Sequence, residues 1–190
     1  MTSEQFAHED LLYAVSNKKD GNLSCRFGKK EEIIDNRIKF LEKYGLTLQD
    51  CVITSLVQGD GIMVVGKNDL GRAMNSCEEE TMVADSLITS ERGVYLFLLI
   101  ADCMPTILYD PIKRALALVH LGRPTTSLKL VQKTIRRMVE RWGTDPVDLL
   151  VHGGPSIGKN AYKLDFFKED ENEWRGFVEQ REDGGFYVDV

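Results

Sequence analysis

The sequence predicts a single α+β domain, a mixed β-sheet sandwich with flanking helices, on two observations. Apolar runs of strand length mix with helix-like segments without the strict strand–helix–strand repeat of a parallel sheet. The 190 residues can bury one sizeable core, and 43% apolar against 28% charged residues is the balance of an ordinary globular domain. We therefore expect residues 1–190 to form one domain.

The first predicted helix covers residues 31–44. It opens with acidic residues, places Ile34, Ile38 and Leu41 on one face, and stops at Gly45. The second helix ends at Gly143 and has an apolar stripe. Its members are Leu128, Val131, Ile135, Met138 and Trp142. The polar region 166–183 is a third candidate helix.

Strands are predicted wherever short apolar runs lie between turn signals. Six such runs are 51–58, 62–66, 83–89, 93–100, 147–152 and 185–190, and two more in residues 100–122 form a predicted hairpin that is described below. The first two flank a tight turn at 59–61, the arrangement of a hairpin. The run 93–100 is apolar enough to be buried on both faces. Residues 67–82 are polar and irregular and favour a loop or lid, and residues 1–20 favour a flexible end.

Charge and composition exclude several classes of partner. A net charge of −6 and a pI near 5.2 give no basic surface for nucleic acid or for anionic lipid. The sequence has no apolar stretch of about 20 residues and no basic-then-apolar leader, so we expect a cytoplasmic protein. The four cysteines form no CxxC pair, and we expect them to be reduced thiols.

The stretch IADCMPTILYDPIKRALALVHLG, residues 100–122, places a cysteine and a histidine at the ends of a predicted hairpin. If Asp110 to Lys113 form the turn, Tyr109 pairs with Arg114, and Cys103 faces His120 across the strands. Such a pair is either a plain buried contact, an activated thiol with Asp102 as orienting carboxylate, or two ligands of a zinc site. The residues alone leave these alternatives open.

Two neighbouring features are weaker candidates. His152 ends a later strand and is a speculative third metal ligand. GGPSIGKN, residues 153–160, approaches a phosphate-binding loop, but Asn160 replaces the hydroxyl that would hold magnesium and Pro155 lacks a backbone N–H. A tight glycine turn is the better interpretation.

Three segments resemble the laccase-domain proteins, also called multicopper polyphenol oxidoreductases and now regarded as zinc-dependent purine nucleoside enzymes. ADCMP at 101–105 is similar to their A-D-C-x-P block, and ALALVHLG at 115–122 to their second metal-ligand block. GPSIGKNAYKL at 154–164 is similar to a glycine-rich segment of the family. GNLSCRFG, Asn36-Arg37, LVQGDGIMVV and VADSLIT occupy the expected order upstream, so the resemblance runs from about Asn22 to the end.

The resemblance implies an α+β sandwich and one zinc ion held by a His-Cys-His set. Carried over by position, the ligands are Cys103 and His120, and Gln58 stands where the first histidine is expected. A glutamine amide is a poor zinc donor, so we expect a weakened site. Arg123 and Pro124 also replace the family's tryptophan–arginine pair. In the family that it resembles the chains usually continue past the last strand, so we expect a divergent and shortened relative.

The resemblance further implies phosphorolysis of purine nucleosides and deamination of adenosine. Phosphate would be held by cationic or polar side chains, with Arg37 as first candidate and Asn22 and Arg26 behind it. Asp102 would orient His120, move a proton, or simply bind backbone. Three histidines are too few for a multicopper site, which argues against copper-dependent phenol oxidation. The competing hypotheses are a non-catalytic relative that keeps the fold and a metal-free Cys103/His120 thiol hydrolase. Oligomeric state does not follow from the sequence.

Overall fold

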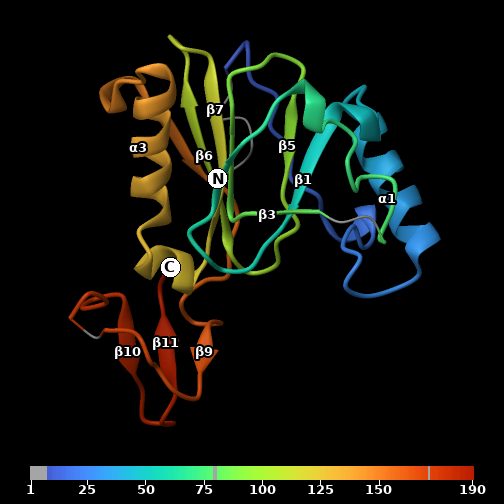
Figure 1. Ribbon diagram of the computed structural model, residues 1–190. Helices are drawn as coiled ribbons and strands as arrows, with labels where there is room; N and C mark the ends of the chain where they lie inside the picture. Colours follow the sequence, from blue (N-terminus) through green and yellow to red (C-terminus); the bar gives the residue numbers. More distant parts are fainter. Residues whose placement is uncertain (1–7, 79–80, 171) are drawn as a thin grey trace.

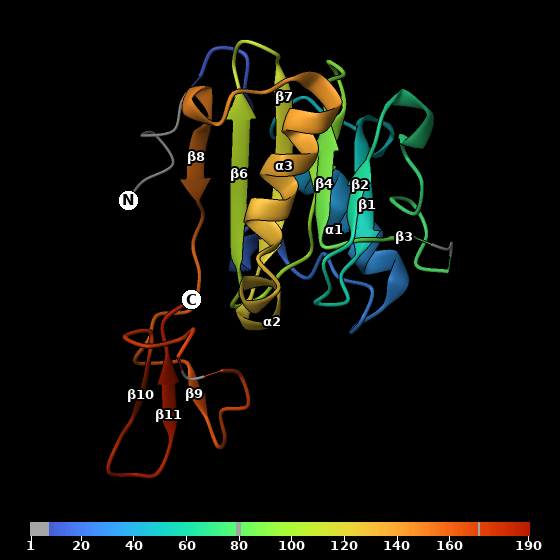
Figure 2. The same ribbon diagram turned by 60° about the vertical axis from the view of Figure 1, so that its left-hand side comes forward.

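The computed structural model describes residues 8–78, 81–170 and 172–190. Its main body is built on a five-stranded sheet (Figures 1 and 2). The strands in spatial order are β2 (Ile62–Val64), β4 (Ser86–Thr89), β7 (Ala115–Leu121), β6 (Met104–Asp110) and β8 (Leu150–Gly153). β2 and β4 run parallel, and every other neighbouring pair is antiparallel. The predicted mixed sheet is confirmed.

A second sheet has three parallel strands, β3 (Met82–Val83), β1 (Cys51–Ser55) and β5 (Tyr95–Phe97). β1 and β2 therefore lie in different sheets, and the hairpin predicted for 51–58 and 62–66 is wrong. The turn between them binds the Asp85 side chain instead of closing a hairpin, because the N–H groups of residues 57–59 all donate to that carboxylate.

Helix α3 (Leu130–Trp142) covers one face of the five-stranded sheet, as Figure 2 shows. Leu130 and Met138 are fully buried against Leu108, Ala117 and Val119. The helix ends at Gly143, whose φ of +66° is a left-handed conformation that suits glycine, as the sequence indicated. The short α2 (Arg123–Ser127), which begins directly after β7 with a proline in its first turn, was not predicted.

Helix α1 (Lys30–Glu42) is confirmed, but it buries a different face from the predicted one. Ile33, Arg37, Phe40 and Leu41 are buried, whereas Ile38 is 37% exposed. Phe40 and Leu41 pack with Leu23, Leu48, Cys51 and Ile53 in the core beside β1. The apolar stripe was misassigned because the buried face contains an arginine.

A third sheet, with antiparallel strands β10 (Val178–Gln180), β11 (Phe186–Val188) and β9 (Lys163–Leu164), lies below the main body in Figure 1. The helix predicted for 166–183 is wrong, since the described residues there form turns and β10. The indole N–H of Trp174 donates to Ser127 Oγ at 3.0 Å, and Arg123 pairs with Glu169. These contacts fasten the third sheet to α2.

Short 3₁₀ turns complete the chain at Lys18–Asp20, Leu48–Asp50, Lys67–Asp69 and Pro146–Asp148. The described residues of 67–82 are mostly turns before β3, as predicted for a loop. The flexible end predicted for 1–20 falls partly on residues 1–7, outside the described residues. In the described ranges no helix is long and apolar enough to span a bilayer.

Candidate functional site

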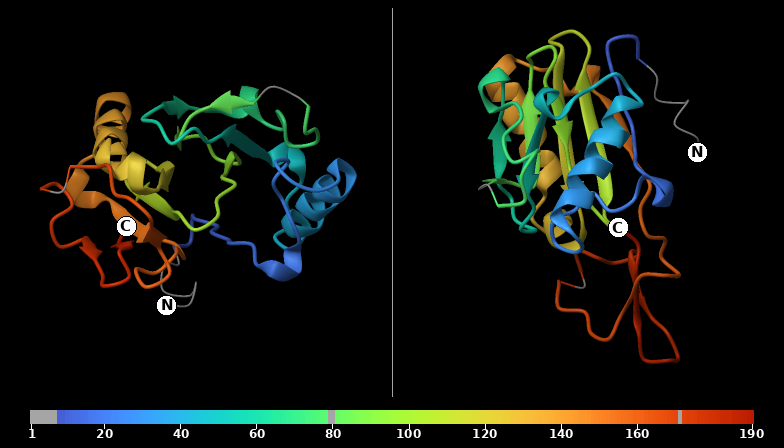
Figure 3. Two further views of the ribbon diagram at one scale, coloured as in Figure 1. Left: turned by 90° about the horizontal axis from the view of Figure 1, so that it is seen from below. Right: turned by 90° about the vertical axis from the view of Figure 1, so that its right-hand side faces the viewer.

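A groove with a volume of about 1340 Å³ runs along the face of the five-stranded sheet that α3 leaves uncovered. Alternate residues of β6 and β7 line it, while the residues between them face α3. The other wall comes from β5, from residues 9–16 and from residues 22–27. Figure 3 (left) shows the course of the backbone from below, with the amino-terminal segment in blue. The side chains of β5 are only half-buried because they border this groove, so the prediction that 93–100 is buried on both faces is wrong.

Cys103 and His120 meet at one end of the groove. Pro105, not Cys103, is the partner of His120 across the hairpin, because the loop is Pro111–Arg114 and Asp110 pairs with Ala115. The predicted register is wrong by two residues, and a shift of two leaves both side chains on the same face. A Cβ at Gly122 would lie 2.8 Å from Cys103 Sγ and 3.6 Å from His120 Nε2. The thiol and the imidazole therefore face the same small space.

Asp85 anchors His120 from behind. Its carboxylate oxygen Oδ1 lies 2.7 Å from His120 Nδ1, and its carbonyl accepts the backbone N–H of His120 at 2.8 Å. Asp85 is completely buried and His120 is 4% exposed. The carboxylate fixes the proton on Nδ1 and leaves the Nε2 lone pair toward Cys103. Asp85 was missed, although an acid at the start of an apolar strand, in VADSLIT, is a signal that could have found it.

Gln58 belongs to the same cluster. Its backbone N–H donates to Asp85 Oδ1 at 3.0 Å, the oxygen that also binds His120 Nδ1. The shared Asp85 oxygen places the backbone of Gln58 near His120, and Gln58, Cys103 and His120 all line the groove. In the described part of the chain, however, no three or more His, Cys, Asp or Glu residues form a group that could hold a metal ion. A thiol, an imidazole and a neutral amide do not fit a tight zinc site, which takes three good ligands.

The surroundings of Cys103 do not activate its thiol as a nucleophile. Burial raises the pKa of its thiol, and the negative charges of Asp102 and Asp85 raise it further. A thiol with a raised pKa carries little thiolate at neutral pH, which disfavours the metal-free hydrolase. Asp102 is exposed with φ +70°, and its carbonyl accepts the N–H of Ile157 at 2.8 Å. The carboxylate that orients His120 is thus Asp85 rather than Asp102.

His152 does not join this cluster as a third ligand. It lies opposite Ile107 on β8, and its ring packs edge-on against Tyr13 with the centroids 5.0 Å apart. The following GGPSIGKN segment leads into turns and not into a helix. That geometry supports the glycine-turn interpretation.

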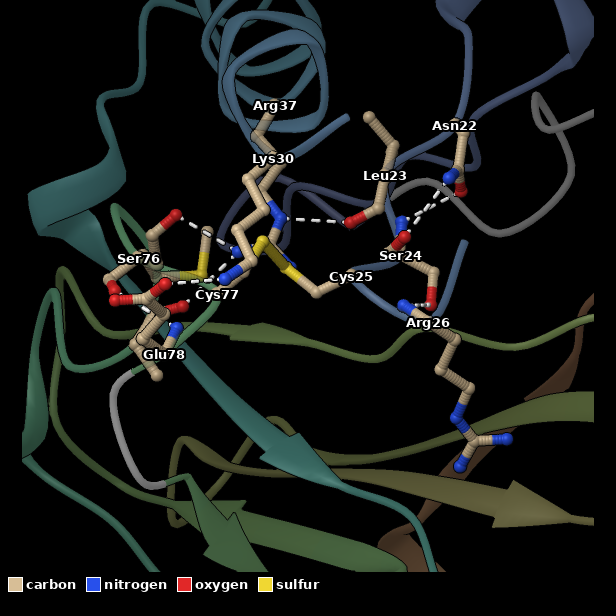
Figure 4. The surroundings of a disulfide bond; sticks show 12 residues. Asn22, Leu23, Ser24, Cys25, Arg26, Lys30, Arg37, Ser76, Cys77 and Glu78 are labelled. Atoms are coloured by element: carbon tan, nitrogen blue, oxygen red, sulfur yellow. Dashed lines mark hydrogen bonds and ion pairs between the residues drawn. A yellow bond between two sulfur atoms is a disulfide. The ribbon is translucent and has the colours of Figure 1, made fainter. Parts of the chain in front are cut away.

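The three residues expected to hold phosphate have different surroundings. Arg37 is 1% exposed, and its guanidinium donates to the carbonyls of Leu23, Ala73 and Met74 at 2.9–3.1 Å (Figure 4). The side-chain amide of Asn22 donates to backbone carbonyls within its own loop. These bonds occupy the guanidinium of Arg37 and the amide of Asn22 within the fold, and their expected contact with phosphate stays a prediction. Arg26 is exposed at the groove with one bond to Leu56 O, and it remains a candidate.

Two cysteines are joined in a disulfide, Cys25–Cys77, with their Cα atoms 5.5 Å apart. The prediction of four reduced thiols is wrong for this pair, because folding brings together two loops that are 52 residues apart in the sequence. Cys51 and Cys103 are unpaired, and burial raises the pKa of Cys51 to about 12.

Comparisons with known proteins give a consistent picture. The chain is 26% identical over 137 residues to "Purine nucleoside phosphorylase YlmD" of Bacillus subtilis, covering 72% of this chain and 49% of that protein. It is 31% identical over 165 residues to "Purine nucleoside phosphorylase ORF3" of Streptomyces griseus, covering 85% and 64%. The chain thus spans about half to two thirds of the length of these curated relatives.

A solved structure supports the fold. The crystal structure of YlmD from Geobacillus stearothermophilus superimposes with a TM-score of 0.78 at 24% identity, covering 88% of this chain and 65% of that one. The family model described as multi-copper polyphenol oxidoreductase laccase matches residues 14–190. With that match over most of its length, this chain belongs to the multi-copper polyphenol oxidoreductase laccase family.

Proposed function

We propose that this chain acts on purine nucleosides at the Cys103 end of the groove, cleaving the bond between base and sugar with phosphate. The observation that carries the proposal is the convergence of Cys103, His120 and Gln58 on the groove, with Asp85 behind them. The curated relatives, which are purine nucleoside phosphorylases by name, support the choice of substrate.

His120 has the geometry of a proton carrier. Its Nδ1 is held at 2.7 Å by a fully buried carboxylate, which fixes the orientation of the ring. In phosphorolysis a phosphate oxygen bonds to the sugar carbon as the bond to the base breaks, and Nε2 accepts the proton of the phosphate and passes it to the departing base. Arg26, exposed on the groove wall, holds the phosphate.

Zinc, if bound, would be held by Cys103 and by His120 Nε2, and it would supply Lewis-acid help in place of the proton transfer. Since Gln58 offers only an amide oxygen, we propose that zinc binds weakly, and no step above depends on it. The same substitution favours a second candidate function, a non-catalytic relative that still binds a nucleoside in the groove.

The test is turnover of adenosine and inosine by the purified chain, with and without phosphate, beside its zinc content. Free base released only with phosphate supports phosphorolysis. Base released without phosphate indicates hydrolysis, and inosine formed from adenosine indicates deamination. His120→Gln, which removes the proton carrier, should abolish turnover. His152→Gln, which removes a histidine that does not line the groove, should not. If the chain binds a nucleoside without turnover, even with added zinc, the enzyme is rejected and the non-catalytic relative is supported.

A further inference from the structure

The Cys25–Cys77 disulfide lies in the wall of the groove and ties two loops together. Both cysteines are half-buried and line the groove, together with Arg26 and Phe27. Phe27 is 78% exposed, so its ring is open to a ligand. Residues 22–28, here called the arginine loop, thus offer a cation and an aromatic ring to a ligand in the groove.

Buried Arg37 organises the sulfur atoms from one side. Its Nη2 lies 3.3 Å from Cys25 Sγ, while Nη1 binds the carbonyls of Ala73 and Met74 in the other loop (Figure 4). Lys30 also forms an ion pair with Glu78 next to Cys77. A guanidinium beside a sulfur stabilises its thiolate, so Cys25 is the better leaving group of the pair.

From this arrangement we propose that Cys25–Cys77 is a thiol–disulfide exchange site that controls the arginine loop. A small thiol of the glutathione class attacks Cys77 Sγ as its thiolate, and the S–S bond breaks with its electron pair on Cys25. A second small thiolate attacks the outer sulfur of the mixed disulfide on Cys77, so that this S–S bond breaks with its electron pair on Cys77 and the oxidised small disulfide leaves. Two external thiols are oxidised to one disulfide, and the protein disulfide is reduced to two cysteines, which take up the two protons.

Reduction loosens residues 24–28 of the arginine loop, whereas its first two residues are held independently of the disulfide. Leu23 is buried and its carbonyl accepts from Arg37 at 2.9 Å, and the Asn22 carbonyl accepts from Asn36 at 3.1 Å. The other ties of residues 24–28 are the Asn22 side chain, which bonds Ser24 and Phe27, and Arg26, which bonds Leu56 O at 3.2 Å. The reduced state therefore positions Arg26 and Phe27 less well for a ligand. The link between loop position and ligand affinity rests on the proposed function, while the exchange reaction does not.

The first experiment maps the thiols of the full chain. Alkylation of the unfolded, unreduced protein should modify Cys51 and Cys103 and leave the 25–77 peptides crosslinked. Brief treatment with reduced glutathione followed by an alkylating agent should give glutathione on Cys77 and the alkyl group on Cys25. Four alkylated cysteines before any reduction, or glutathione predominantly on Cys25, would overturn the exchange site.

The second experiment compares oxidised and reduced protein by amide hydrogen exchange and by adenosine binding. Protection of residues 24–28 should fall at least about tenfold on reduction while β6 and β7 are unchanged. Adenosine affinity should fall about tenfold, the value of one charged hydrogen bond. Cys25→Ser with Cys77→Ser should behave as the reduced form in either buffer. If protection of the loop does not change on reduction, the disulfide does not regulate the loop. If the loop loosens but the protein binds adenosine in neither state, the disulfide regulates the loop and the proposed function is rejected.

Discussion

At the residue scale, Asp85 holds two parts of the site with one side chain. Its two oxygens accept N–H groups from residues 57–59 at 2.9–3.2 Å and face His120 Nδ1 at 2.7 Å. A buried carboxylate is stable only when such donors surround it. The Asp85 carboxylate, which does not itself line the groove, therefore fixes the positions of Gln58 and His120 relative to each other.

Asp85→Asn should destabilise the fold and loosen the site. The asparagine amide has one acceptor oxygen, and its NH2 group would face the N–H groups of residues 57–59, which also donate. We therefore expect the free energy of unfolding to fall by about 2–4 kcal/mol in urea denaturation. Asp102→Asn is the matched control, because Asp102 is exposed and asparagine tolerates its positive φ. It should change stability by less than about 0.5 kcal/mol. Equal losses in the two variants would refute the role of Asp85.

Gln58→His should create a zinc site from the two donors already present. An imidazole there completes three ligands with Cys103 and His120, and we expect zinc affinity to rise at least about tenfold in isothermal titration calorimetry. Val57→His is the control, since it adds an imidazole one residue away at a position that is 59% exposed. A similar gain from both changes would mean that the added histidine binds zinc on its own.

At the element scale, the sequence was informative where apolar spacing decided the structure. The stripe of α3 and its glycine stop were sufficient to place that helix. The face of α1 was not predictable, because buried Arg37 is compensated by carbonyls of two distant loops. The prediction for β5 failed for another reason: its side chains pack against two core clusters but also border the groove, which leaves them half-buried.

The same reasoning explains which parts of the site were predicted. The sequence could place Cys103 and His120 on the same face of the sheet despite the error in register. A shift of two residues along a strand does not change the face to which a side chain points. Asp85 and the disulfide could not be paired with their partners, because those contacts join loops and strands that local patterns do not relate.

Met138→Ala should test the packing of α3 on the sheet. Met138 is fully buried, and truncating such a side chain leaves a cavity that costs about 2–5 kcal/mol. Val139→Ala, one residue along the helix and 38% exposed, should cost much less. Urea unfolding of both variants measures the difference, and a small loss for Met138→Ala would mean that α3 packs differently.

Replacing Cys25 and Cys77 together with serine should lower stability through the unfolded state. The disulfide spans 52 residues of chain. By the chain-entropy relation, closing a loop of that size stabilises the fold by about 4 kcal/mol. The double variant and the reduced natural chain should unfold at the same urea concentration. A stability equal to that of the oxidised chain would show that the crosslink does not form.

At the scale of the whole molecule, the contacts described between the third sheet and the body centre on α2. Trp174 is 4% exposed, packs edge-on against Phe167 and bonds Ser127 on α2, and Arg123 pairs with Glu169 and lies over the Phe167 ring. We therefore expect the third sheet to open separately from the main core.

Trp174→Ala should therefore release the third sheet while leaving the five-stranded sheet intact. Hydrogen exchange should quicken in residues 163–190 and stay constant in β6 and β7. Phe177→Ala is the control, because that ring is 56% exposed. Faster exchange throughout the chain would show that the sheets unfold as one unit.

The size of the groove has a consequence for chemical probes. Its volume of about 1340 Å³ exceeds the roughly 300–1,000 Å³ of typical small-molecule pockets. Cys103 and His120 lie toward one end of β6 and β7, and Tyr109 and Leu116 lie toward the other. Two small fragments could occupy the two ends at the same time. Joining them by a linker of matching length would raise affinity far above that of either fragment, because the second fragment then binds at high effective concentration.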